Sequence, residues 1–385
     1  SMTSRFFLFL MCLLAPVIAS PKAFNLIESN ASIYLLGDLS TGLIISEKNP
    51  SRDINSTSLT KLMTLYLIFD AVKNGILNAQ GKIKVSRTAA TTRGVRMFLN
   101  EGDSVKIEDL LKGVVIYGAN DAALALVEEI AGTEAQFIVA MNQKAKVLGL
   151  SQLRFTDAIG ESPNMSPTSA SDLYQLAASI ILDHAPSYAL FKLNQHEWQG
   201  ITQYSSNSLL GRDSYNDGLM VSRSASGGTI GIISSVRDGR RVLLVIADNS
   251  SKGQFASKAQ DLLNQAFKKF TTVHIAEPNT PIAQLTVGHG VNEVLDIGST
   301  DKISVTIPRE RKNEIEVVIE SVQPLIAPIK YGDVVAKLTV KLKTDTIQTS
   351  ELVALKRIRR AGVMVRGWKR LKSLTLHLLE FMKNN

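Results

Sequence analysis

Two residues, Ser58 and Lys61, have the types and the spacing for nucleophilic catalysis. They lie in the segment 54–64, where a polar Asn/Ser/Thr cluster runs into an apolar stretch with helical period. Ser or Thr ahead of such a stretch is typical of a capped helix N-terminus, and residues three apart share one helix face. A lysine whose pKa is lowered by burial or by other cations can take the proton of a serine hydroxyl. Ser-x-x-Lys alone is common, so an N-cap followed by a solvated lysine is the alternative.

Length and composition describe a globular chain without a cysteine-based site. The 385 residues suffice for two domains with hydrophobic cores. Cys12 is the single cysteine, so an internal disulfide and a zinc site built on cysteines are excluded. The five histidines are scattered without ligand spacing. We therefore expect no metal and no cofactor.

The net charge of +8 is concentrated at the C-terminal end of the chain. Residues 356–385 hold nine basic residues against one acidic residue, Glu380, which accounts for the whole excess. Residues 1–355 are therefore close to neutral, and we expect no nucleic-acid partner. On a helix, the tail would place apolar side chains opposite basic ones, with Trp368 at the edge. This pattern predicts a helix lying in the plane of an anionic membrane surface; docking on the protein's own surface is the alternative.

The first 20 residues have the pattern of a signal peptide. Arg5 precedes an almost wholly apolar run from Phe6 to Ile18, which is too short for a stable membrane anchor. The small residues Ala19 and Ser20 then offer a cleavage site. We expect an exported protein that lacks residues 1–20.

Periodicity predicts an α+β domain over residues 21–272. The segments 32–46 and 229–247 have the alternation and the turn residues of β-hairpins. Helical periodicity covers these segments: 58–75, 108–130, 135–148, 169–182 and 254–270. The second of them is interrupted at Gly118. Terminal strands that meet in one antiparallel sheet, with a helical block between them in sequence, form such a domain.

The sequence pattern of residues 273–355 predicts a small all-β domain. Helical periodicity stops after Thr272, and short segments such as 303–307 and 315–319 lie between Gly, Pro and Asp turns. The expected organisation is a signal peptide, an α+β domain, a β domain and a basic amphipathic helix: 1–20, 21–272, 273–355 and 356–385.

Further short strings complete a family pattern. They are Arg96-Met97-Phe98-Leu99, Asn120-Asp121-Ala122 and Phe155-Thr156-Asp157-Ala158-Ile159-Gly160. Over essentially its whole length the chain resembles the serine D-alanyl-D-alanine carboxypeptidases, low-molecular-mass penicillin-binding proteins that trim peptidoglycan stem peptides. The resemblance implies a penicillin-binding transpeptidase/β-lactamase-like domain followed by a small β domain. It also implies peripheral anchoring at the periplasmic face of the bacterial inner membrane.

The family uses three motifs, Ser-x-x-Lys, Ser-x-Asn and Lys-Thr-Gly, and this chain keeps the first intact. The second reads Gly118-Ala119-Asn120, so the asparagine is present and the serine hydroxyl is missing. The third falls after Asp217-Gly218-Leu219 and reads Met220-Val221-Ser222, followed by Arg223.

The altered third motif bears on substrate binding. By the resemblance, its lysine and threonine hold the substrate's terminal carboxylate, which Met220 and Val221 can neither pair with nor hydrogen-bond. Ser222 adds bulk where a glycine lets the substrate lie against the strand. Arg223 is a good carboxylate binder, but its odd spacing from Met220 places it on the opposite strand face. The backbone N–H groups of Ser58 and Arg223, the oxyanion hole by resemblance, survive side-chain changes.

The resemblance implies acyl transfer on a peptidoglycan pentapeptide. Lys61 takes the proton of Ser58, Ser58 attacks the carbonyl between two terminal D-alanines, and water hydrolyses the acyl-enzyme. Asn120 positions the peptide and Lys61, and β-lactams would acylate Ser58 by the same route. Four residues would line the substrate site: Met220, Val221, Ser222 and Arg223.

Two alternatives remain open. The loss of one oxyanion or recognition contact can cost roughly 10²–10³ in rate. Two altered motifs are therefore compatible with a catalytically impaired, membrane-tethered protein that binds peptidoglycan or acts as a scaffold. The other alternative is a β-lactamase-type hydrolase of the same fold. The predicted anchor and the lack of an evident carboxylate motif for deacylation weigh against it.

Overall fold

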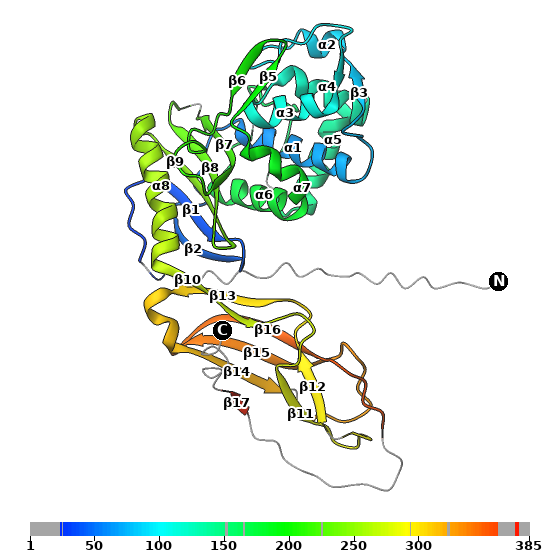
Figure 1. The fold of residues 1–385 in the computed structure, drawn as a ribbon, viewed down its shortest axis with the longest axis vertical. Coiled ribbons are helices and arrows are strands. Elements are labelled where there is room, and N and C mark those ends of the chain that lie inside the picture. Colours follow the sequence, from blue (N-terminus) through cyan, green and yellow to red (C-terminus); the bar gives the residue numbers. More distant parts are fainter. Residues whose placement is uncertain are drawn as a thin grey trace, which may run out of the picture.

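The computed structural model describes most of the chain after residue 23. The described residues are 24, 26–150, 153–164, 166–224, 226–292, 294–321, 324–360 and 374–376; the side chains of Ser58 and of 374–376 are outside the description. An α+β domain and a β domain follow each other along the longest axis of the molecule (Figure 1).

A five-stranded antiparallel sheet, in the order β2-β1-β9-β8-β7, holds the first domain together. Its strands are β1 (Ile33–Asp38), β2 (Leu43–Lys48), β7 (Asn216–Arg223), β8 (Thr229–Arg237) and β9 (Arg240–Asp248). β1 pairs with β9, with Leu35 opposite Val245, so the two ends of the domain meet in its centre. This pairing confirms the predicted sheet of terminal strands.

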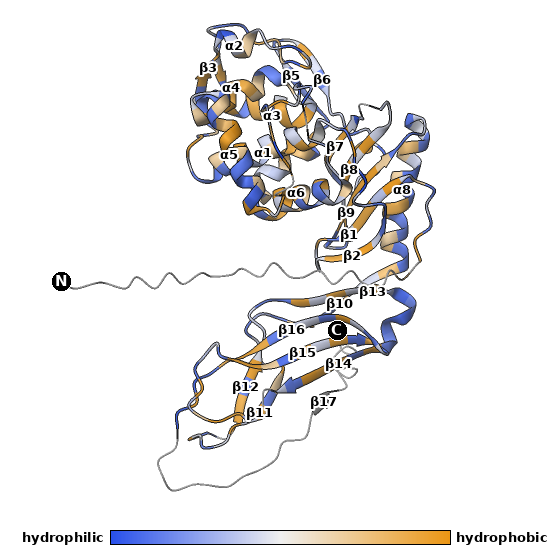
Figure 2. Cartoon of the chain, turned by 180° about the vertical axis from the view of Figure 1, so that it is seen from behind, coloured by the Kyte–Doolittle hydropathy of each residue, from blue (hydrophilic) through white to orange (hydrophobic). Residues whose placement is uncertain are grey.

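Helices cover the sheet on both faces (Figure 1). α8 (Lys252–Lys269) packs its buried residues, among them Phe255 and Leu262, on one face. Its remaining surface is hydrophilic, whereas the strands beneath it are apolar (Figure 2). The helical block consists of α1 (Ser58–Lys73), α2 (Arg87–Ala90), α3 (Ile107–Tyr117), α4 (Asn120–Ala131), α5 (Glu134–Val147), α6 (Ala170–Asp183), α7 (Ala185–Tyr188) and the 3-10 turn η1 (Ala189–Lys192). Two hairpins accompany it: β3 (Lys82–Lys84) with β4 (Ser104–Lys106), and β5 (Gln195–Trp198) with β6 (Ile201–Tyr204).

α1 is the central helix of this block. Leu62, Met63 and Phe69 are fully buried because other helices surround α1 on several sides. The helix begins at Ser58, as predicted, and the side-chain N-cap of the alternative interpretation is not formed by Thr57. Thr57 precedes the helix with helical backbone angles (φ −77°, ψ −14°), and its side chain makes no cap hydrogen bond. Capping hydroxyls normally need an extended backbone to reach the first-turn N–H groups.

The second domain is built of strands, in agreement with the sequence, and its first strand starts at Phe270, three residues before the expected boundary at 273. Its strands are β10 (Phe270–Ala276), β11 (Ala283–Thr286), β12 (Val294–Gly298), β13 (Ile303–Pro308), β14 (Ile315–Ser321), β15 (Val334–Leu342), β16 (Asp345–Ala354) and β17 (Leu374–Leu376), with a 3-10 turn, η2 (Arg309–Glu314). β10 pairs with β13, and the others form one sheet in the order β11-β12-β16-β15-β14-β17. Leu295, Leu338 and Leu352 are fully buried in its core.

The two predicted membrane-related segments lie mostly outside the described residues. The signal peptide 1–20 is wholly outside. Of the predicted anchor helix, the structure describes 356–360 and β17, which pairs antiparallel with β14. At all of these described residues the predicted helix is wrong. Ile358 and Arg360 form β-bridges with Ile329 and Gly290, and the edge of β14 offers backbone partners to the extended segment 374–376. None of the described helices is long and apolar enough to span a bilayer.

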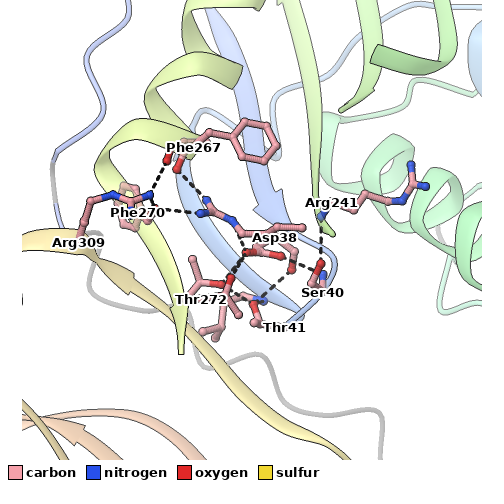
Figure 3. Close-up of polar contacts among 12 residues, drawn as sticks. Asp38, Ser40, Thr41, Arg241, Phe267, Phe270, Thr272 and Arg309 are labelled. Carbon is pink, nitrogen blue, oxygen red and sulfur yellow. Dashed lines mark hydrogen bonds and ion pairs between the residues drawn. The ribbon is translucent and has the colours of Figure 1, made fainter. Parts of the chain in front are cut away.

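A buried polar cluster joins the two domains (Figure 3). The fully buried Asp38 carboxylate, at the end of β1, accepts hydrogen bonds from Thr272 (3.2 Å) and Thr306 (2.8 Å) of the second domain. Arg240 Nε lies 3.0 Å from the same Asp38 oxygen. Arg309 donates to the backbone oxygens of Phe267, Lys268 and Phe270, where α8 ends.

Candidate active site

The first predicted motif lies at the start of α1. Ser58 is the first residue of this helix. Its backbone belongs to the described structure, whereas its side chain does not. Lys61 follows one turn later and donates its backbone N–H to Thr57 O (3.2 Å). The side chain of Lys61 is directed to the junction of α3 and α4.

The turn between α3 and α4 binds the Lys61 ammonium group. Gly118 ends α3 with a left-handed backbone (φ 70°), which favours glycine and turns the chain sharply into α4. Lys61 Nζ donates to Gly118 O (3.2 Å) and to Asn120 Oδ1 (2.8 Å). The structure therefore brings Lys61 and Asn120 together, as predicted. A Cβ at position 118 would lie 3.7 Å from Lys61 Nζ, at ordinary contact distance, so space does not exclude a serine there although the backbone disfavours one.

Burial lowers the pKa of Lys61, and the carboxylates of Glu161 and Asp157 oppose this shift. An ammonium group loses hydration on burial, so its neutral form gains in population. A buried lysine in this neighbourhood is therefore a better proton acceptor at a given pH than a solvated lysine.

The Asn120 side chain hydrogen-bonds to three other residues of the site. Its Nδ2 donates to Arg93 O (2.9 Å) and to Glu161 Oε1 (3.2 Å), while Oδ1 accepts from Lys61. These partners determine the orientation of the amide, because donors lie on one side and acceptors on the other. Asn120 is 1% exposed, so few alternative orientations are open to it.

The neighbouring Asp121 explains two of the family-like strings at once. Its buried carboxylate accepts from the backbone N–H groups of Met97 (2.8 Å) and Leu99 (3.0 Å). This holds the segment 96–99 against the start of α4. The strings 96–99 and 120–122 are therefore two halves of one local structure.

The third string, 155–160, packs behind the start of α1. Ala158 O accepts from the buried Thr64 hydroxyl of α1 (2.6 Å). Gly160 has φ 80°, and a Cβ there would lie 2.9 Å from Thr57 Cβ, so only glycine fits. The string is a supporting loop, and it places the next residue, Glu161, at the site.

β7 forms the opposite wall, and both of its ends are anchored. Asp217 accepts from Arg241 Nη1 (2.9 Å) and from the Tyr188 hydroxyl (3.0 Å). At the other end, Ser224 donates to Asn55 O (3.2 Å), which joins β7 to the segment ahead of α1. The backbone of Arg223 is thereby held near the N-terminus of α1.

The altered third motif lines the same cavity as Lys61 and Gly118. This cavity has a volume of about 190 Å³, and its wall includes Met220, Val221 and Ser222. Met220 also packs on the core of the helical block, whereas Val221 packs on the core around α8. Arg223 is exposed and is absent from the cavity wall.

Glu161 is the site residue that sequence reasoning missed. The family-like string ends at Gly160, and nothing in the sequence indicates that the following carboxylate meets Asn120, 41 positions away. The only available signal was its adjacency to that string. Its presence supplies an acidic group at a site where no carboxylate was expected.

Comparisons with known proteins agree with this geometry. The family described as "D-alanyl-D-alanine carboxypeptidase" matches residues 18–251, and "Penicillin-binding protein 5, C-terminal domain" matches 270–360. The chain is 30% identical over 348 residues to D-alanyl-D-alanine carboxypeptidase DacC of Escherichia coli, covering 88% of this chain and 87% of the relative.

Solved structures give the same result. Penicillin binding protein 5 from Haemophilus influenzae superposes with a TM-score of 0.81 at 26% identity, covering 87% of this chain and 99% of that one. Penicillin-binding protein D2 from Listeria monocytogenes, solved in an ampicillin-bound form, superposes with a TM-score of 0.55 at 26% identity, covering 63% and 99%.

The fold is therefore that of a two-domain penicillin-binding protein, with an α+β domain and an all-β C-terminal domain. The chain belongs to the D-alanyl-D-alanine carboxypeptidase family. This confirms the family and the fold class expected from the motifs.

Proposed function

We propose that the protein is a serine-type D-Ala-D-Ala carboxypeptidase that acts on peptidoglycan stem peptides through a Ser58 acyl-enzyme. One observation carries the proposal. The Lys61 amine, one turn after Ser58, is held by Asn120 Oδ1 at 2.8 Å and has its pKa lowered by burial. A base of this kind, next to a serine at a helix start, is what nucleophilic activation requires.

Each predicted catalytic residue has a role in this scheme. Lys61 takes the Ser58 proton as the hydroxyl oxygen attacks the carbonyl carbon, and it returns a proton to the leaving amine of the terminal D-alanine. Asn120 holds Lys61 and positions the peptide. The backbone N–H groups of Ser58 and Arg223 stabilise the oxyanion, which is the largest electrostatic contribution in acyl transfer. Water then releases the shortened peptide.

The altered third motif weakens recognition of the substrate's terminal carboxylate. Met220 and Val221 offer no charge and no side-chain hydrogen bond to the substrate's terminus, and Ser222 takes the glycine position. We expect slow turnover of peptides that end in a free carboxylate. β-Lactams, which relatives bind in solved structures, are expected to acylate Ser58.

The place of action follows from the two terminal segments. Residues 1–20 direct export, and the basic tail predicted over 356–385, in its parts outside 356–360 and β17, holds the protein to the periplasmic face of the inner membrane through apolar burial and anionic headgroups. The β domain, 273–355, then separates the catalytic domain, 21–272, from the membrane surface as a spacer or a protein-interaction module.

The altered motifs favour one second candidate, a catalytically impaired peptidoglycan-binding or scaffold protein. Release of D-alanine from a peptide that ends in D-Ala-D-Ala distinguishes the two. Residues 21–385 should release D-alanine, and Ser58→Ala should not. If residues 21–385 release no more D-alanine than Ser58→Ala does, and the protein still binds peptidoglycan in a pull-down, the scaffold is favoured.

A further inference from the structure

The Glu161 carboxylate lies beside the Asn120 amide, the group that positions the peptide in the proposed function. Its Oε1 is 3.2 Å from Asn120 Nδ2, and a Cβ at Gly94 would lie 3.2 Å from the same oxygen. Three segments, around residues 94, 120 and 161, therefore converge on one amide group.

The backbone that carries Glu161 is well anchored, although the residue is exposed. Asp157 Oδ2 accepts from the backbone N–H groups of Glu161 (2.7 Å) and Ser162 (3.2 Å). Ala158 is held from both sides: its N–H donates to Glu134 Oε1 (3.0 Å), and its carbonyl accepts from Thr64. The position of the carboxylate next to Asn120 is therefore a property of the loop.

The hydrogen-bonding capacity of the Asn120 amide group is fully used on its donor side. An NH₂ group has two protons, and Arg93 O and Glu161 Oε1 accept both. A peptide carbonyl that is to bind Asn120 has to displace one of these acceptors. The Arg93 contact is made by backbone, so the Glu161 side chain is the one that can move away.

The same carboxylate acts on the charge of Lys61. Burial lowers the pKa of Lys61, and two carboxylates oppose this shift, Glu161 more strongly than Asp157. A negative group near an ammonium stabilises the protonated form. While Glu161 occupies the site, the protonated lysine is more populated than it would be without this carboxylate, and a protonated lysine cannot take the Ser58 proton.

We propose that Glu161 is a positioning residue that keeps the substrate-free site inactive. Its carboxylate accepts a hydrogen bond from the Asn120 amide and stabilises the Lys61 ammonium until a substrate carbonyl displaces it. On displacement the carboxylate withdraws, and Lys61 releases its proton to solvent. The neutral amine then accepts the Ser58 proton. Substrate entry and base formation are thereby coupled. The inference rests on the proposed Ser58 acyl-enzyme function for its catalytic consequence.

Glu161→Gln removes the negative charge near Lys61 but keeps a side-chain oxygen that can accept from Asn120. Glu161→Ala removes both the charge and the hydrogen bond to the Asn120 amide. Glu129→Gln is the matched control, because Glu129 is an exposed carboxylate near the end of α4 that does not act on Lys61. The first readout is the ¹³Cε signal of Lys61 against pH in protein labelled with ¹³C-lysine, assigned with Lys61→Arg. The second is the second-order rate constant of acylation by a fluorescent penicillin against pH.

The proposal predicts that Lys61 titrates at lower pH in both Glu161 variants and unchanged in Glu129→Gln. On the rising limb of the pH–rate profile, acylation of the Glu161 variants increases roughly 3- to 10-fold, since each unit of pKa is a factor of ten in neutral amine. In Glu161→Ala the plateau also rises, because Asn120 is free.

A Lys61 titration in Glu161→Gln that coincides with that of the unchanged protein would overturn the proposal. So would a fall of acylation in both variants with Lys61 titrating as before. If no protein is acylated at any pH, the Ser58 function fails, while the Lys61 titration still decides the role of Glu161.

Discussion

The Asp38 cluster gives a quantitative prediction for Asp38→Asn. The Asp38 side chain is 0% exposed and the Arg240 side chain 11%. Arg240 Nε, Thr272 and Thr306 all lie within 3.2 Å of one carboxylate oxygen. Asparagine has almost the same shape, but its NH₂ group would face either these donors or the Ser40 N–H, which now donates to the other carboxylate oxygen (2.9 Å).

The expected loss follows from what remains around Arg240. Removing one partner of a buried ion pair costs about 3–5 kcal/mol. Arg240 also donates to Ala266 O (2.7 Å) and Phe270 O (2.9 Å), and these bonds persist in the variant. We therefore expect a decrease in the free energy of unfolding of about 2–3 kcal/mol, below the full cost of an unpaired buried charge.

Urea unfolding, followed by circular dichroism and by tryptophan fluorescence, measures this loss. Because Thr272 and Thr306 belong to the second domain, the two domains should also unfold at more separate urea concentrations in Asp38→Asn. Asp345→Asn, an exposed carboxylate in β16, is the control and should change stability by less than about 0.5 kcal/mol. A loss in Asp38→Asn no larger than that of the control would refute the assigned role of this cluster.

Two further predictions concern the site. Acylation by a penicillin should rise with pH and level off below pH ~10.4, the pKa of free lysine, because burial lowers the pKa of Lys61 and so makes the neutral amine available at lower pH; a pH–rate profile still rising at that value would contradict this. Met220→Lys should raise kcat/KM for a peptide with a free terminal carboxylate by at least about tenfold relative to its C-terminal amide, since a hydrogen bond to a charged group contributes about 1.5–3 kcal/mol; an equal change for both peptides would show that position 220 does not meet the carboxylate.

Sequence reasoning succeeded where the signal is local. Hydrophobic periodicity located α1, and the glycine at position 118 divided one helical pattern into α3 and α4. The hairpin β8–β9 was evident from strand residues around the turn at Arg237–Arg240. The pairing of Lys61 with Asn120 came from the family motifs, not from periodicity.

The parts that could not be predicted depend on contacts between distant positions. Asp38 and Thr306 are 268 positions apart, and no local pattern relates them. The absent side-chain cap at Thr57 accompanies helical backbone angles at that residue, which no local sequence pattern indicates. Glu161 reaches Asn120 only because Gly160 permits the loop to pass close behind Thr57.

The most direct test of the central claim is intact-protein mass spectrometry of residues 21–385 after exposure to a fluorescent penicillin. A working nucleophile activated by Lys61 predicts a covalent adduct of one drug molecule that is absent in Ser58→Ala. Folded protein that forms no adduct at high drug concentration and long times would contradict the catalytic account and leave a tethered wall-binding protein.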